Sequence, residues 1–250
     1  MATLTILGSG EAFDPHVPNS SLLYQGAQTV LVDCGFAAVQ ALWRRSPDPE
    51  FLDAVLLSHH HADHTFGLPA LLMRIRDDRR RKLAVIGPPN TKQYLTTLFD
   101  LAYAPGMGWL KFPLDVIECA PGDPVTLGAL HIKTALPDHR IPVLSTRWEV
   151  DGAPHFAYSA DGKVTPQTRR LFKNSNVLAH ECFGMPGREG PVHAHIETVL
   201  EVAAESGVKT LVIVHQQNEQ RQLIADYAQK QAIFSGQVLL PEGIMTMTVG

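Results

Sequence analysis

The chain has 250 residues, of which 45% are hydrophobic and 18% charged, and its formal net charge at pH 7 is −4. This apolar content is enough for one or two ordinary hydrophobic cores. The acidic balance gives no overall attraction to nucleic acid or to an anionic membrane, and the sequence contains no run of about 18 apolar residues that would span a bilayer. Three scattered cysteines are too few for a disulfide framework, so we expect them to be buried and the protein to be cytoplasmic.

Short apolar segments bounded by turn residues recur along the chain and predict β-strands. They cover residues 4–7, 21–24, 30–32, 54–57, 83–86, 114–117, 130–134, 146–150, 156–158, 177–179, 210–214 and 237–239. The first segment has no basic residues before it and stops at Gly8, so we expect a strand there and not a signal peptide.

Helical periodicity occurs in five segments, at residues 36–44, 67–77, 90–101, 196–206 and 218–231. In the clearest of them, 196–206, apolar residues recur every three or four positions and the pattern stops at Gly207, a suitable helix end. Strands and helices are mixed along the whole length, without a linker or a short repeat. We therefore predict one α/β domain, residues 1–250, with two sheets inside and helices on the outer faces.

The densest group of ligand-type side chains follows a predicted strand, where residues 58–64 read Ser-His-His-His-Ala-Asp-His. His59 and His61 are two residues apart, so their side chains can lean the same way and bind one metal ion. Asp63 and His64 can then reach a second ion. Because zinc accepts imidazole and carboxylate ligands, this loop predicts a metal site. A surface cluster of histidines is the less favoured alternative.

The motif His59-x-His61-x-Asp63-His64 after an apolar strand resembles the signature of the metallo-β-lactamase superfamily. His139, Asp161 and His215 follow in the family's order, each at the end of an apolar segment. The similarity extends from the turn at residues 7–10 to residues 241–243. It implies the αββα sandwich of that superfamily, in which two central mixed sheets carry helices on their outer faces.

The resemblance also implies the roles of these side chains. By it, a first metal ion is bound by His59, His61 and His139, a second by Asp63, His64 and His215, and Asp161 bridges the two. We expect zinc, with manganese or iron(II) as alternatives. Two such ions would make hydroxide available from a shared water near pH 7 and would offset negative charge in the transition state. The expected activity is hydrolysis, with Asp63 among the catalytic residues.

Two further residues lie close to the metal motif in the sequence. Asp33 resembles the family's acidic position near the metal loop, and we expect it to accept a hydrogen bond that orients a ligand. A turn-forming aspartate is an equally weighted alternative. His60 is expected to be a solvent-facing spacer.

A later part of the chain resembles the ribonuclease Z-like branch of the superfamily. Residues 179–183, Ala-His-Glu-Cys-Phe, and the segment His193-Ala194-His195 match motifs whose glutamate and later histidine hold a proton near the leaving group. The resemblance assigns these roles to Glu181 and His195, with His193 as the rival of His195. A carboxylate can fix the tautomer of an imidazole and keep it protonated, which suits a general acid. Polar residues that cap a helix are the alternative.

The sequence also departs from ribonuclease Z, which grips transfer RNA with a long glycine-rich arm. Only 21 residues separate His139 from Asp161, and residues 147–152 predict a plain hairpin there. After His215 the chain continues Gln-Gln-Asn, where that branch usually has small hydroxyl residues. A basic stretch at residues 74–82 could guide a phosphate chain, but two aspartates interrupt it and we favour a solvated helix end.

We therefore predict a phosphodiesterase that acts on a small or cyclic phosphodiester, such as a cyclic nucleotide or a cyclic sugar phosphate. Small phosphodiesterases of this fold, including one associated with carbon–phosphorus lyase, have about this length. The alternatives are a ribonuclease Z-like endoribonuclease on transfer-RNA precursors, a thioester or lactone hydrolase, a non-hydrolytic accessory protein of a biosynthetic pathway, and an iron redox enzyme. The expected partner is a small phosphoester, with nucleic acid less favoured and no membrane. Similar proteins often dimerise, so a homodimer is compatible with the chain.

Overall fold

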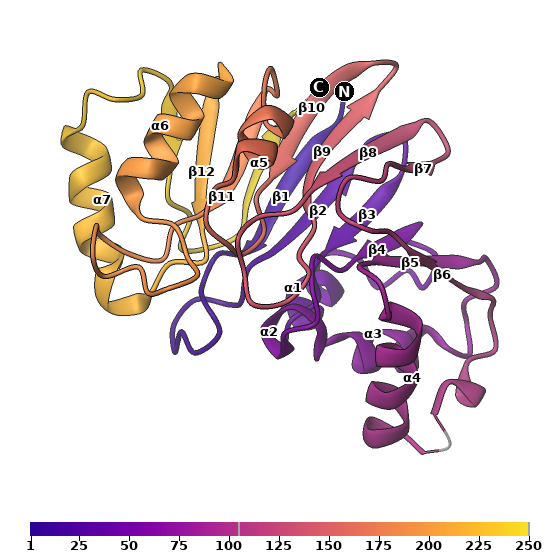
Figure 1. Ribbon diagram of the computed structural model, residues 1–250. Helices are drawn as coiled ribbons and strands as arrows, with labels where there is room; N and C mark the ends of the chain where they lie inside the picture. The colour runs from indigo at the N-terminus through magenta and orange to yellow at the C-terminus, as the bar shows by residue number, and fades with distance from the viewer. Residues whose placement is uncertain (105, 250) are drawn as a thin grey trace.

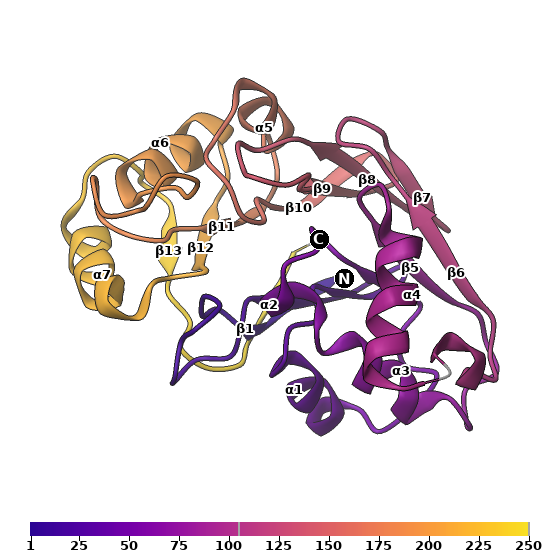
Figure 2. The same ribbon diagram turned by 60° about the horizontal axis from the view of Figure 1, so that its bottom comes forward.

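The computed structural model describes residues 1–104 and 106–249. Two seven-stranded sheets stack on each other, and helices cover the outer face of each (Figure 1). Figure 2 shows the two helical layers on opposite sides of the stacked sheets. This is the αββα architecture that we predicted from the sequence.

The first sheet combines the N-terminal half of the chain with the last strand. Its order is β14 (Met245–Thr248), β1 (Thr3–Gly8), β2 (Ser21–Gln25), β3 (Thr29–Val32), β4 (Ala54–Leu56), β5 (Leu83–Gly87) and β6 (Leu114–Glu118). The pairs from β14 to β3 are antiparallel, and those from β3 to β6 are parallel.

The second sheet has the same division into a parallel and an antiparallel half. Its order is β13 (Gln237–Leu239), β12 (Thr210–Val214), β11 (Val177–Glu181), β10 (Ala153–Tyr158), β9 (Ser145–Val150), β8 (Leu130–Ala135) and β7 (Val125–Leu127). The strands from β13 to β10 are parallel, and those from β10 to β7 are antiparallel. Consequently β8, β10 and β12 all end at the same edge of this sheet.

The helices bury apolar stripes against the outer faces of the sheets. The first sheet is covered by α1 (Ala38–Arg45), α3 (Leu68–Ile75) and α4 (Thr91–Ala102), and the second by α5 (Pro166–Leu171), α6 (Ile196–Ser206) and α7 (Arg221–Lys230). A short helix α2 (Ala62–Thr65) and the 3₁₀ turns η1 (Gly106–Trp109) and η2 (Asn218–Gln220) lie in connections. Among the helices that the structure describes, none has the length and apolar character to cross a membrane.

Alternation along the strands explains how each sheet is buried on both faces. Ile6 and Leu22 point into the core between the sheets, whereas their neighbours Leu7 and Leu23 pack under the helices. Successive side chains of a strand point to opposite faces, so a strand buried on both faces needs a continuous apolar run. The central core also contains Trp148 from the second sheet, and its ring lies 5.4 Å from that of Tyr24.

Candidate metal centre

The seven predicted metal-binding side chains meet where loops follow strands of both sheets. Four lie in the loop and short helix after β4, and one each follows β8, β10 and β12. Strands that run in the same direction end at one edge of a sheet, so residues far apart in sequence come together there. The residues are His59, His61, Asp63, His64, His139, Asp161 and His215.

These side chains form two groups that share one carboxylate. His59, His61, His139 and Asp161 make the first group, and Asp63, His64, Asp161 and His215 make the second. Within each group, one ligand atom per residue lies within 4.8 Å of all the others. The division into two groups matches the two ligand sets that the resemblance implied, and Asp161 is common to both.

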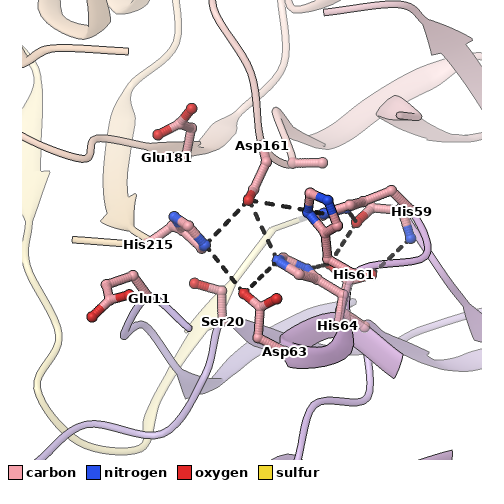
Figure 3. A network of polar contacts seen from close by, with 12 residues as sticks. Glu11, Ser20, His59, His61, Asp63, His64, Asp161, Glu181 and His215 are labelled. Atoms are coloured by element: carbon pink, nitrogen blue, oxygen red, sulfur yellow. Dashed lines mark hydrogen bonds and ion pairs between the residues drawn. The ribbon is translucent and has the colours of Figure 1, made fainter. Parts of the chain in front are cut away.

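Asp161 lies between the histidines of both groups (Figure 3). Its Oδ2 atom is 3.2 Å from His215 Nε2 and 3.9 Å from His59 Nε2. Its Oδ1 atom is 3.5 Å from His64 Nε2. On the other side, Asp63 Oδ2 is 3.1 Å from His64 Nε2 and 3.4 Å from His215 Nε2. Asp161 thus lies close to histidines of both groups, whereas Asp63 lies close to histidines of the second group alone.

Several buried polar atoms in this centre have no hydrogen-bond partner in residues 1–104 and 106–249. They include His64 Nε2, His139 Nε2 and Asp161 Oδ1. An unpaired buried polar group costs about 1–3 kcal/mol of stability. Imidazole nitrogen and carboxylate oxygen are donors that a divalent ion such as zinc accepts, so the residues present fit metal ions.

The protonation of the two groups differs in the metal-free protein. Burial lowers the pKa of His59 well below its usual value and also lowers the pKa values of His61 and His139, so these rings are neutral at pH 7. Burial opposes a charge on His64 and His215 too, but nearby carboxylates outweigh it. They raise the pKa of His64 well above its usual value and the pKa of His215 to about 9.

Asp33 lies behind the centre, fully buried, and orients one of its histidines. Its Oδ2 atom accepts hydrogen bonds from His64 Nδ1 at 2.8 Å, from the Tyr158 hydroxyl at 2.9 Å and from Ser58 Oγ at 2.9 Å. The hydrogen bond that we expected from a metal-site residue to Asp33 is therefore present. The contacts of Ser58 and Tyr158 with Asp33 were not predicted, although each is a polar residue at or just after the end of an apolar strand and within three residues of a predicted ligand.

His60 is not the solvent-facing spacer that we expected. Its ring stacks on Tyr94 of α4, with centroids 4.4 Å apart and planes at 8°, and its Nε2 atom lies 2.8 Å from Thr91 Oγ1. The Tyr94 hydroxyl lies 2.6 Å from Thr65 Oγ1, which donates to the carbonyl oxygen of His61 at 2.8 Å. Helix α4 therefore holds the metal loop from its outer side.

Glu181 meets His193, and not His195 as the resemblance assigned. Glu181 Oε1 accepts hydrogen bonds from His193 Nδ1 at 3.2 Å and from the backbone amides of Gly162 at 2.9 Å and Ala194 at 3.2 Å. Glu181, His193 and His215 also form a third compact group of ligand-type atoms.

His195 has a different function in the structure. It is the residue before α6, and its side chain accepts a hydrogen bond from the Thr198 backbone amide, which otherwise has no partner in the first turn. Its Nε2 atom lies 3.1 Å from Thr198 Oγ1. The ring of His195 is thereby held at the start of α6. The residue that pairs with Glu181 is His193 and not His195.

The family model for the Anti-Pycsar protein Apyc1 matches residues 2–238. The chain therefore belongs to the Anti-Pycsar protein Apyc1 family. This Apyc1-family chain is 31% identical over 223 residues to the uncharacterized protein Rv1339 of Mycobacterium tuberculosis, covering 85% of the chain and 80% of the relative. It is 25% identical over 242 residues to ribonuclease Z of Macrococcus caseolyticus, covering 75% and 78%.

Solved structures share the fold of the Apyc1-family chain over its whole length. The metallo-β-lactamase fold protein YhfI from Bacillus subtilis superposes with a TM-score of 0.83, 22% identity and 98% coverage of both chains. Human tRNase Z, short form, gives 0.80 with 20% identity and 99% coverage of both. A diphosphatase from the PhnP family gives 0.77 with 17% identity, covering 100% of this chain and 98% of that one. The chain has the metallo-β-lactamase fold in its ribonuclease Z-like and PhnP-like form.

The Apyc1-family chain has no long arm between His139 and Asp161. Residues 139–161, all of which the structure describes, form a loop and the hairpin of β9 and β10, joined by a turn at Asp151 and Gly152. The prediction that a transfer-RNA-binding arm is absent is thus confirmed.

A cavity of about 380 Å³ opens at the metal centre of the Apyc1-family chain. Its floor includes Asp63, Asp161 and His215. The walls come from the loop between β1 and β2, from the segment after His139, and from the loop between β11 and α6, which contributes His193. The cavity has the volume of a small-molecule site, and residues of both ligand groups line it.

Proposed function

We propose that the chain is a dinuclear metal-dependent phosphodiesterase that hydrolyses a small or cyclic phosphodiester, for example a cyclic nucleotide. The observation that carries this proposal is the pair of ligand groups that share Asp161 at the floor of the cavity. Two divalent ions bound there, zinc by preference, would supply an activated water and offset the negative charge of a phosphate.

In this proposal, the side chains around the centre have different roles. Asp33 fixes the ring of His64 through the 2.8 Å hydrogen bond, and Asp161 keeps the two ligand groups adjacent. Asp63 Oδ2 faces the same space and can accept the proton of the attacking water. Glu181 holds Nδ1 of His193, which leaves Nε2 of that ring to donate a proton to the leaving oxygen.

The basic stretch at residues 74–82 does not form a binding site for a long phosphate chain, which supports a small substrate. Arg79 is fully buried and donates to four backbone carbonyl groups, and Arg81 pairs with Glu50 and Asp53. The basic stretch is therefore not the wholly solvated helix end that we favoured, and most of its charge is neutralised. It precedes β5, whereas the metal loop follows the parallel strand β4, so the two lie at opposite edges of the sheet. We infer that it does not guide a phosphate chain to the centre.

Endoribonuclease activity of the ribonuclease Z type is the second candidate, because several curated relatives carry the name ribonuclease Z, at 23% to 30% identity. The missing arm counts against it. A direct comparison of a transfer-RNA precursor with small phosphodiesters on the same preparation decides between the two.

The test of the proposal is turnover by protein of known metal content. Zinc- or manganese-loaded protein is assayed on bis-p-nitrophenyl phosphate, 3′,5′-cyclic nucleotides, a transfer-RNA precursor and a thioester panel. We expect hydrolysis of the small phosphodiesters, loss of activity with a chelator, and loss in Asp161→Asn. Turnover of the RNA precursor alone, or of thioesters alone, would refute the proposal.

A further inference from the structure

The loop between β1 and β2 exposes an aromatic ring beside the metal centre. Phe13 is 88% exposed, and together with Glu11 and Ala12 it lines the same cavity as Asp63 and His215. A phenyl ring is among the side chains that gain most from leaving water. A ligand or a partner that covers this exposed ring would therefore gain binding free energy by removing it from water.

This loop is fixed by its own polar side chains. Glu11 Oε2 accepts from the backbone amide of Phe13 at 2.9 Å, and Asp14 Oδ1 accepts from two following backbone amides, each at 2.9 Å. Asn19 Nδ2 donates to the Glu11 carbonyl at 3.1 Å, and the Asp14 carboxylate pairs with Arg221 of α7. Glu11 and Asn19 are buried while Phe13 is displayed, which reverses the usual distribution of polar and apolar residues. The ring is thus presented on a preorganised support.

The base of the loop is attached to the metal centre itself. Gly10 forms bridges to Asn19 and to Gln216, and Gln216 is the residue after His215. Across the cavity, Phe183 is already stacked on His193, with ring centroids 4.5 Å apart. Within the part of the chain that the structure describes, Phe13 has no aromatic partner. Its position relative to the floor is therefore fixed, and its face is free for a ligand.

We propose that Phe13 is the platform on which an aromatic part of the substrate stacks, a nucleobase being the chemical class that fits. The inference rests on the proposed function, because the phosphate is taken to bind at the metal centre while the base lies on Phe13. Stacking is tolerant of base identity, since every base has a π face. Phe13 therefore determines whether a phosphodiester with a base is preferred to one without, and does not choose among the bases.

Binding by the zinc-loaded protein tests the platform without relying on turnover. Calorimetry compares adenosine 5′-monophosphate with ribose 5-phosphate, which has the same phosphate and sugar but no base. We expect wild type to bind the nucleotide more tightly. Phe13→Ala should weaken nucleotide binding about tenfold and leave ribose 5-phosphate unchanged, whereas Phe13→Trp should retain the preference. Phe36→Ala, which removes an exposed ring outside the cavity, is the matched control and should change neither ligand.

Kinetics on 3′,5′-cyclic AMP and on base-free cyclic ribose phosphate give the second readout. Phe13→Ala should raise KM for the nucleotide about tenfold at unchanged kcat and leave the base-free substrate unaffected. The inference is overturned if wild type binds both monophosphates equally, if Phe13→Ala weakens both alike, or if its only effect is on association between copies of the chain. The failure of the proposed function is separate: no phosphodiester is hydrolysed although the base-dependent difference in binding persists.

Discussion

His193 and His195 stand two residues apart and have different surroundings. His193 shares a hydrogen bond with Glu181 and lines the cavity, whereas His195 is occupied at the start of α6. The position of His195 could have been inferred from the sequence, because the predicted helix begins at Ile196 and a polar residue just before a helix is a typical N-cap. The hydrogen bond to Glu181 could not, because it depends on how the loop folds back on β11.

Substitution of the two histidines separates these roles. His193→Ala should lower kcat by about 10²–10⁴-fold for substrates with an alkoxide leaving group, because the proton donor is lost. It should have little effect on bis-p-nitrophenyl phosphate, since p-nitrophenolate leaves without protonation. His195→Ala should leave kcat unchanged and lower the free energy of unfolding by about 0.5–1 kcal/mol. Steady-state kinetics measure kcat, and urea unfolding measures the free energy of unfolding. If His195→Ala lowered kcat as much as His193→Ala, the assignment of the proton donor to His193 would be contradicted.

The protonation of His215 predicts how metal uptake depends on pH. Its pKa of about 9 means that the metal-free protein holds this proton at pH 7, and a metal ion must displace it. Metal affinity should therefore rise with pH toward 9. In the metal-free protein, the raised pKa of His215 also stabilises the folded state. This contribution is complete below about pH 6.5 and is lost as the pH rises through about 9. Calorimetry in buffers of different ionisation enthalpy measures the released protons; an affinity that does not vary between pH 6 and 9 would argue against this.

Helix α4 acts on the metal centre through a chain of contacts. Tyr94 stacks on His60, and its hydroxyl reaches Thr65, which holds the carbonyl group of His61. Tyr94→Phe should weaken zinc binding a few-fold, and Tyr94→Ala about tenfold, because outer contacts orient the ligands. Thr97→Ala, on the exposed side of the same helix, is the control and should not change it. Competition with a coloured chelator measures the affinities, and equal affinity in all three variants would show that α4 does not position the loop.

The elements that the sequence predicts well are those with continuous apolar runs. Strands buried on both faces have such runs, and the predicted segments lie within a few residues of the observed strands. Two strands were not predicted: β14, whose residues alternate between half-buried and exposed at the sheet edge, and β7, which has only three residues. The six-residue helix α5 was not predicted either, because its capping box between Thr165 and Thr168 lacks the usual glutamate. Short elements that depend on edges or caps have little signal of their own.

The metal centre exists only when the two sheets are stacked. The loop after β4 belongs to the first sheet, and His139, Asp161 and His215 follow strands of the second. The convergence of these side chains could be predicted because each one follows an apolar strand, but the proposed division into two ligand groups came from the family resemblance. One central core contains residues of both sheets, which supports our proposal that residues 1–250 form a single domain.

Metal ions should therefore stabilise the whole molecule. An ion that binds only the folded protein at a hundred times its Kd adds about 2.7 kcal/mol. For a chain of this size, removal of the metal should lower Tm by roughly 5–10 °C. Asp161→Asn should remove most of this difference because both groups use that carboxylate. Thermal unfolding with chelator, and after zinc is restored, checks the prediction; an unchanged Tm in chelated wild type would contradict it.

The pairing of β1 with β14 has a consequence for synthesis. Leu4 stands opposite Met247, so the edge of β1 is covered by a strand that is synthesised only after all the elements that lie between β1 and β14 in the sequence. Until then the nascent polypeptide presents an open row of backbone amide and carbonyl groups, to which other chains can add. Translation speed and chaperone supply should therefore affect the yield of this protein more than that of one whose edge strands are neighbours in sequence.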